Sequence, residues 1–154
     1  MRVFLAGIIQ GSHVEQDIHD QNWRQAVTKA LGVHLPEAHV YDHFRRHPQS
    51  LGYELPKADQ TFQAGLVEAA ACELLIAYLP EASMGTAIEM HEARRNGAAV
   101  LTVSPLAANW VVRLYSDRIF PDVAALEAYL ASGQVRALLA ERSATRPGAA
   151  PPAS

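Results

Sequence analysis

One stretch of the chain places small hydroxyl side chains and a carboxylate at a spacing that suits hydroxyl-rich or anionic ligands. It reads PEASMGTAIEMHEA and runs from Pro80 to Ala93. Ser83, Gly85 and Thr86 stand at the start of a predicted helix, where backbone N–H groups favour such ligands. Glu89 follows about one turn into that helix. We expect the helix dipole to hold Glu89 ionised, as a nucleophile or as an acceptor for sugar hydroxyls.

The alternative for Glu89 is a solvated surface position, which is where most glutamates lie. Its neighbours Ala87, Ile88 and Met90 are apolar, and a surface position does not require such a setting. Glu89 is therefore our candidate for a chemical role.

A second candidate segment follows the first predicted strand. It reads GIIQGS, from Gly7 to Ser12, and contains Gln10. Its glycines allow a backbone to approach a ligand closely. The segment lacks the GxGxxG spacing of a dinucleotide-binding loop. A structural turn and a ligand-binding loop both remain open for it.

Histidines offer a third possibility. His39, His43 and His47 stand four residues apart with Asp42 among them, and on a helix their imidazoles would share a face able to hold a metal. Pro48 and the polar surroundings argue against a regular helix. We favour solvated histidines in a loop, and we expect neither a metal nor a cofactor.

The elements that must position these residues alternate along the chain, as is typical of a parallel sheet covered on both faces. Strands are predicted at Met1–Gly7, Ala38–Tyr41, Glu73–Leu79, Ala98–Val103 and Ile119–Phe120. Helices are predicted at Gln21–Leu31, at Ala58–Ala71, at Gly85–Asn96 with Gly97 closing it, and from Val123 with Asp122 as its cap. The polar segment Asp42–Pro56 is predicted to be a long loop, and such loops are often functional.

This order predicts an α/β fold with a three-layer, doubly wound, parallel five-stranded sheet of the flavodoxin-like or Rossmann-like type, in strand order 2-1-3-4-5. Such sheets bind ligands beyond the carboxyl ends of their strands, beside strand 1. The loops after Gly7, Tyr41 and Leu79 should therefore surround a site. We assign residues 1–142 to one domain and expect the proline-rich segment 143–154 to be a disordered tail.

Composition narrows the function classes. The chain has 154 residues, 49% hydrophobic and 19% charged, which fits one globular domain. Its net charge of -3 and its scattered basic residues give no footprint for nucleic-acid binding. No apolar run approaches the ~18 residues that a membrane span needs. The single cysteine, Cys72, excludes a disulfide framework, and we expect a cytoplasmic protein.

Taken together, GIIQGS, ELLIAYL and SMGTAIEM resemble the nucleoside 2-deoxyribosyltransferase family and the related 2'-deoxynucleoside 5'-phosphate N-hydrolases. The resemblance covers about Arg2 to Pro105. It implies that Glu89 attacks the anomeric carbon of the sugar, and that Ser83 matches a residue that holds a 5'-phosphate in some relatives. It also implies a homo-oligomer, at least a dimer, in which a neighbouring subunit helps to close the site. The substrate-binding residues implied are Gly7, Gln10, Gln63, Ser83, Gly85 and Thr86.

Two positions depart from the family's pattern. Relatives carry an acidic aspartate on the helix before strand 3, and that register places Gln63 here. Asp59 lies four residues earlier, hence on the same helical face, and is the candidate replacement. Gln10 stands where the phosphate hydrolases have arginine. A nucleoside is therefore a better candidate substrate than its monophosphate, because phosphate favours charged, forked donors.

The leading hypothesis is an enzyme that cleaves or transfers the N-glycosidic bond of a (deoxy)nucleoside or related N-riboside by a retaining double displacement. Glu89 would be the nucleophile and Asp59 the acid. The alternative is a non-catalytic nucleoside- or nucleotide-binding module that kept the fold and lost the acid. Four aromatic residues are candidates either for stacking on a base or for packing: Tyr41, Phe44, Tyr53 and Trp110.

Overall fold

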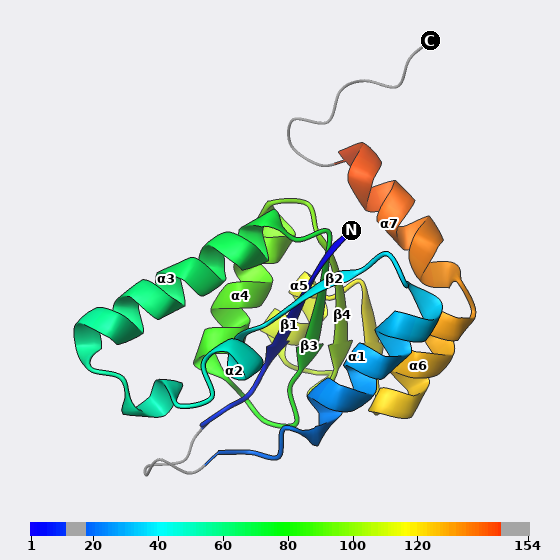
Figure 1. Ribbon diagram of the computed structural model, residues 1–154. Helices are drawn as coiled ribbons and strands as arrows, with labels where there is room; N and C mark the ends of the chain where they lie inside the picture. The colour runs from blue at the N-terminus through cyan, green and yellow to red at the C-terminus, as the bar shows by residue number, and fades with distance from the viewer. Residues whose placement is uncertain (12–17, 146–154) are drawn as a thin grey trace.

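A computed structural model describes residues 1–11 and 18–145 (Figure 1). Five strands form one sheet in the order β2-β1-β3-β4-β5, and all neighbouring pairs are parallel. The α/β class and the strand order predicted from the sequence are confirmed. The strands are β1 (Arg2–Gly7), β2 (His39–Asp42), β3 (Leu74–Tyr78), β4 (Ala99–Val103) and β5 (Arg118–Phe120).

Helices cover both faces of the sheet. One face packs against α1 (Asn22–His34), α6 (Val123–Ala131) and α7 (Gln134–Thr145). The other packs against α3 (Leu55–Ala71), α4 (Met84–Arg95) and α5 (Trp110–Tyr115). A single-turn helix, α2 (His43–Arg46), and a 3-10 turn (Ser50–Gly52) join β2 to α3. In the described residues, no helix has the length and apolar character that crossing a bilayer requires.

The central strands carry the core because both of their faces are covered. Successive side chains of a strand point to opposite faces. In β3, Leu74 and Ile76 therefore belong to the cluster under α1 and α6, while Leu75 and Ala77 belong to the cluster under α3 and α4. All four are fully buried. This double burial explains why the residues after Glu73, LLIAYL, form an unbroken apolar run.

Helix ends follow local side-chain chemistry. The predicted cap Asp122 accepts a hydrogen bond from the backbone N–H of Ala125. The predicted terminator Gly97 adopts a φ of 83°, a left-handed conformation that favours glycine. Gly133, with a φ of 74°, separates α6 from α7. These residues thereby set where the neighbouring helices begin or end.

Three predictions about the polar and terminal segments need correction. Residues 42–56 are not one loop, because α2, the 3-10 turn and the first residues of α3 lie within them. Helices α5 and α7 were not predicted as separate elements. Helix α7 ends at Thr145, so its last residues fall in the segment assigned to a disordered tail. The remaining tail, 146–154, lies outside the described residues, as does Ser12.

A buried ion-pair cluster fixes α7 and α4 to the sheet. Asp117 accepts a hydrogen bond from Arg94 at 2.8 Å and another from Arg142 of α7. Its second oxygen accepts from the backbone N–H of Val100 in β4 at 2.9 Å. The carboxylate is therefore surrounded by donors from three elements, which offsets the cost of burying its charge.

Candidate active site

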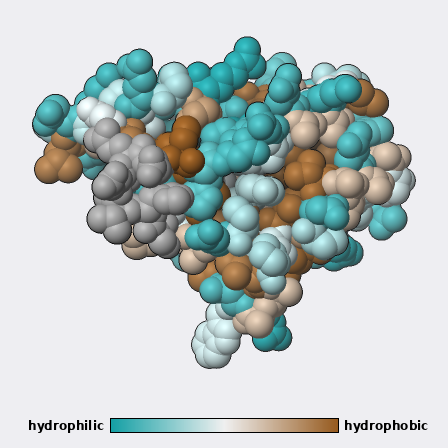
Figure 2. All heavy atoms as spheres, turned by 90° about the horizontal axis from the view of Figure 1, so that it is seen from below, coloured by the Kyte–Doolittle hydropathy of each residue, from teal (hydrophilic) through white to brown (hydrophobic). Residues whose placement is uncertain are grey.

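A cavity of about 330 Å³ opens at the carboxyl ends of β1, β2 and β3. Figure 2 views the molecule from the side toward which the strands point in Figure 1, and hydrophobic side chains are exposed there among hydrophilic ones. The structure brings six of the sequence-predicted site residues to the lining of this cavity: Gly7, Gln10, Ser83, Gly85, Thr86 and Glu89. They come from the loop after β1 and from the start of α4.

Two predicted site residues lie elsewhere. Asp59 and Gln63 are exposed on α3, and neither lines the cavity. The side chain of Gln63 donates to the carboxylate of Asp59 at 3.4 Å, so they share a helical face as predicted. The residue of α3 that does line the cavity is Phe62, one position away on the helix. In a single copy of the chain, α3 supplies an aromatic wall and no acid.

Ser83 caps α4 and keeps a donor available. Its hydroxyl oxygen accepts hydrogen bonds from the backbone N–H of Thr86 at 3.4 Å and from the Thr86 hydroxyl at 3.0 Å. An oxygen that accepts twice still carries its own hydrogen. The Ser83 O–H is thus free to donate to a ligand oxygen at the helix N-terminus.

The pKa of Glu89 is raised to about 8, because burial penalises the charged carboxylate more than the positive charge of Arg24 favours it. The expectation that the helix dipole holds Glu89 ionised is therefore wrong for the free protein near neutral pH. In that state the carboxyl group carries its proton. A role as nucleophile requires that this proton leaves before attack.

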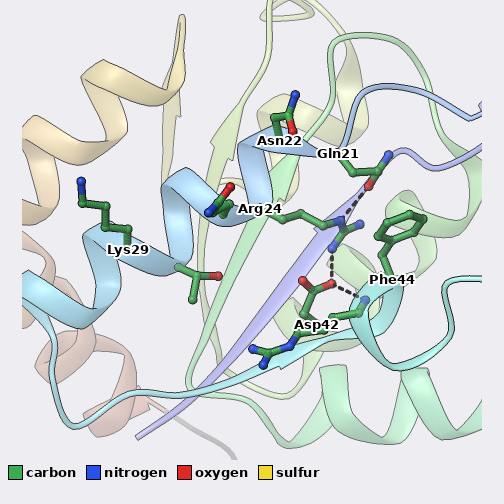
Figure 3. A pocket seen from close by; sticks show the side chains of 9 residues that line it. Gln21, Asn22, Arg24, Lys29, Asp42 and Phe44 are labelled. Carbon is green, nitrogen blue, oxygen red and sulfur yellow. Dashed lines mark hydrogen bonds and ion pairs between the residues drawn. The ribbon is translucent and has the colours of Figure 1, made fainter.

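Arg24 is the residue of this region that the sequence analysis missed. It lies in the first turns of α1 with 5% exposure. Its guanidinium donates to Asp42 at 2.8 Å and to the side-chain oxygen of Gln21 at 2.7 Å, as Figure 3 shows. It also donates to the carbonyl oxygens of Leu5 at 3.2 Å and Gly7 at 3.3 Å. Arg24 thus ties the carboxyl ends of β1 and β2 to α1.

Arg24 also forms part of a second, open cleft of about 640 Å³ beside α1 and β2. Phe44 lies across the guanidinium, 5.8 Å from its carbon to the ring centre (Figure 3). The signal for Arg24 in the sequence was its position, directly after Trp23 at the start of the helix that follows strand 1. An arginine among apolar helix positions has to pair when it is buried.

Gly7 meets an indole ring rather than open space. A Cβ built on Gly7 would lie 2.3 Å from a ring carbon of Trp23. That ring stacks on Tyr78 of β3 with centroids 4.9 Å apart. The close contact expected between this glycine and a ligand is therefore, in the free protein, a contact with Trp23. Any larger residue at position 7 would displace the indole ring.

The four aromatic candidates for base stacking do not line the cavity. Tyr41 stacks on Phe4 with centroids 5.1 Å apart, and the Phe44 ring faces Arg24. Tyr53 pairs with His47, and Trp110 is 77% exposed on α5. In the described chain they serve packing or surface positions.

The three histidines do not share one helix in the structure. His39 begins β2, whereas His43 begins α2 and His47 follows it. The rings of His43 and His47 have centroids 5.2 Å apart. Among residues 1–11 and 18–145, no three histidine, cysteine or acidic side chains are placed to hold a metal. His43 is the histidine of the three that lines the cavity with Glu89.

Comparison with known proteins identifies similar folds. No protein-family model and no curated protein matches the sequence. Among solved structures, a 2-deoxyribosyltransferase from Bacillus psychrosaccharolyticus has a TM-score of 0.62 and 15% identity, covering 84% of this chain and 96% of that one. A CMP N-glycosidase from Clostridium botulinum has a TM-score of 0.49 and 18% identity, covering 88% and 99%. At these identities the likeness concerns the fold.

Proposed function

We propose that the chain is an enzyme that cleaves or transfers the N-glycosidic bond of a (deoxy)nucleoside or related N-riboside, with Glu89 as nucleophile. The observation that carries the proposal is the position of Glu89. Its carboxyl lines a cavity at the carboxyl edge of the sheet, between the loop after β1 and the capped start of α4. The fold likeness to a 2-deoxyribosyltransferase and the resemblance of SMGTAIEM to that family support the same reading.

The reaction is a retaining double displacement. The ionised carboxylate of Glu89 attacks the anomeric carbon, the bond to the base nitrogen breaks, and the base leaves with a proton. Water or a second base then attacks the glycosyl-enzyme and releases Glu89. Ser83, Gly85 and Thr86 surround the helix N-terminus, where hydroxyl or phosphate oxygens of the substrate would be held.

The residues that line the cavity favour a substrate whose 5' end carries no charge. Gln10 is the polar side chain that the described part of the loop after β1 contributes, and no arginine or lysine of residues 1–11 and 18–145 lines this cavity. A 5'-phosphate would therefore lack the charged, forked donor that it prefers. We assign a nucleoside rather than a nucleoside monophosphate as the substrate class.

A substrate panel tests the assignment. Nucleosides, deoxynucleosides and their monophosphates are incubated with the protein, each with and without a second free base, and base release or exchange is followed by chromatography. We expect turnover of at least one nucleoside. The absence of turnover across the panel would contradict the proposal.

The raised pKa of Glu89 sets the pH dependence for substrates whose leaving group needs no proton. A suitable probe is a cationic nicotinamide N-riboside, which releases a neutral base. Since only the ionised carboxylate attacks, kcat/KM should rise with pH and level off above the pKa of about 8. A profile that is flat between about pH 6 and 9 would contradict control by Glu89.

We further propose a homo-oligomer formed through the α3, α4 and α5 layer. The large apolar side chains exposed on these helices' outer surface include Val67, Met84, Trp110 and Leu114, at 65% exposure or more. Met84 also lines the cavity, so a second copy on this face would cover its rim.

Light scattering should accordingly show at least a dimer. Trp110→Glu should shift the protein toward the monomer, because a charge replaces an exposed apolar contact. Val33→Glu is the matched control, since Val33 is a 65% exposed apolar residue on α1 at the opposite face. A monomeric wild-type protein with full turnover would exclude the shared site.

One observation favours a second candidate, the non-catalytic binding module. Neither Asp59 nor Gln63 lines the cavity, so α3 places no acid there. Thermal stabilisation by a nucleoside without turnover would support this candidate. A covalent glycosyl adduct on Glu89, detected by mass spectrometry, would exclude it.

A further inference from the structure

His43 lines the cavity from an element other than α4. It is the first residue of α2, directly after β2, and it lines the same cavity as Glu89. Its Nδ1 is buried and has no hydrogen-bond partner among the described residues. That atom lies next to α3, 3.7 Å from the position of a Cβ built on Gly65. This is an ordinary van der Waals distance, so the edge of the imidazole that carries Nδ1 packs against α3 at Gly65.

Within the part of the chain that the structure describes, His43 and Glu89 are the two cavity-lining residues with titratable side chains. The other lining residues are glycines, apolar residues, hydroxyl residues and Gln10. Asp59, the candidate replacement for the family's acid, is exposed on α3 outside the lining. Among residues 1–11 and 18–145, a proton delivered to a base inside this cavity therefore has one lining residue besides Glu89 to come from.

We propose that His43 is the residue that protonates the leaving base, which makes a nucleoside with a neutral heteroaromatic base the substrate class. The inference rests on the proposed function. Because Nδ1 is buried and faces α3, Nε2 is the ring nitrogen that exchanges protons with the ligand. His43 thereby takes the role that Gln63, an amide without a titratable proton, cannot fill.

The proton balance closes within the cavity. The carboxyl proton of Glu89 passes to His43, which leaves a carboxylate and an imidazolium. Glu89 then bonds to the anomeric carbon while the bond to the base breaks, and the base nitrogen takes the proton from His43. In the second half, His43 accepts a proton from the attacking water and Glu89 leaves as a carboxylate. The proton on His43 returns to Glu89.

The charges around both groups suit this exchange. Burial lowers the pKa of His43, as do the neighbouring His47 and Arg24, while Asp42 raises it. Burial raises the pKa of Glu89, and Arg24 opposes that rise. Near pH 7 the resting pair therefore holds one proton, on the carboxyl. An imidazolium formed during reaction is a strong acid toward the base, because its pKa is low.

Leaving-group dependence is the test. Wild-type protein, His43→Gln and the matched control His39→Gln are compared on two N-glycosides of the same sugar, one carrying adenine and one carrying nicotinamide. Adenine needs a proton to leave, whereas nicotinamide leaves as a neutral molecule without one. We expect His43→Gln to lower kcat/KM by about 100-fold or more with the adenine compound and by less than about threefold with the nicotinamide compound. His39→Gln, at the exposed first residue of β2 and outside the cavity lining, should keep both activities.

A pH profile adds a second measurement. With the adenine compound the wild-type kcat/KM should fall above about pH 8, where the shared proton is lost, in contrast to the plateau with nicotinamide. Equal losses on both compounds in His43→Gln would overturn the inference, as would a loss confined to the adenine compound in Asp59→Asn. If wild-type protein turns over neither compound while the wider panel is also inert, the proposed function itself has failed.

Discussion

Replacing Glu89 with glutamine should abolish turnover and, at the same time, stabilise the protein in alkaline solution. Glutamine keeps the shape of the side chain but cannot form the glycosyl ester. We expect kcat/KM to fall by at least about a thousandfold, as when other catalytic nucleophiles are removed. The loss should be equal for substrates with poor and good leaving groups, because both require attack on the anomeric carbon. That equality distinguishes Glu89 from His43.

The stability change follows from the raised pKa. In the unfolded chain the pKa of the Glu89 carboxyl is about 4.5, whereas burial raises the pKa to about 8 in the folded protein. The folded state therefore holds an extra proton between these values, and its stability falls as pH rises through this window. Glu89→Gln lacks this loss. Its free energy of unfolding should exceed that of the wild type by a few kcal/mol at pH 9 and by much less at pH 4.

Urea unfolding at both pH values measures this difference, with Glu92→Gln as the matched control. Glu92 lies on the same helix and pairs with Arg95 at 3.6 Å, outside the cavity lining. The Glu92 variant should keep the wild-type activity. It should also keep the pH dependence of stability that Glu89 causes. An active Glu89→Gln protein would remove the basis of the proposed function.

Arg24→Met should destabilise the fold by about 3–5 kcal/mol, because it leaves Asp42 buried without its cation. The variant also removes the donors to the carbonyl oxygens of Leu5 and Gly7. Methionine fills the volume of the arginine stem, so the loss reports the hydrogen bonds and the charge. Arg95→Met is the control, since Arg95 is 61% exposed and a surface pair contributes about 0–1 kcal/mol.

Urea unfolding at neutral pH measures the loss of stability. Arg24→Lys separates the contribution of the charge from that of the hydrogen bonds. Lysine restores the charge beside Asp42 but not the fork that reaches Gln21 and the two carbonyls, so it should recover only part of the stability. If enough folded Arg24→Met protein remains, the alkaline rise of kcat/KM should move to higher pH, because Arg24 no longer favours the ionised Glu89. A variant as stable as the wild type would show that the hydrogen bonds to Arg24 are dispensable.

The fold could be predicted because its signals are local. The apolar runs of β1, β3 and β4, the cap Asp122 and the terminator Gly97 lie within short stretches of sequence. Helix α5 escaped prediction because it is short and partly exposed, with Trp110 facing solvent. The segment around α2 escaped because its polar composition resembles a loop, while its order depends on contacts with α1 and α3 that no local pattern contains.

The residues of the candidate site also fall into two groups, those that the sequence could predict and those that it could not. Gly7, Ser83 and Glu89 follow strands or begin a helix, so parallel topology alone brings them to one edge. Arg24 pairs with Asp42 across 18 positions of the chain, and that pairing exists only once β2 lies beside β1. His43 was assigned to solvent as a loop histidine, whereas the structure places it in the cavity lining. Gln63 stands at the family's register and Asp59 one turn before it, and neither residue lines the cavity.

The indole behind Gly7 limits how the cavity can change over evolution. Gly7 forms the floor and lies against Trp23, which itself stacks on Tyr78, so a larger residue at position 7 would dislodge the indole. The walls carry no such constraint, since Gln10, Phe62 and Met84 come from different elements. Descendants of this protein that acquire new substrates should therefore differ at the walls and share the floor.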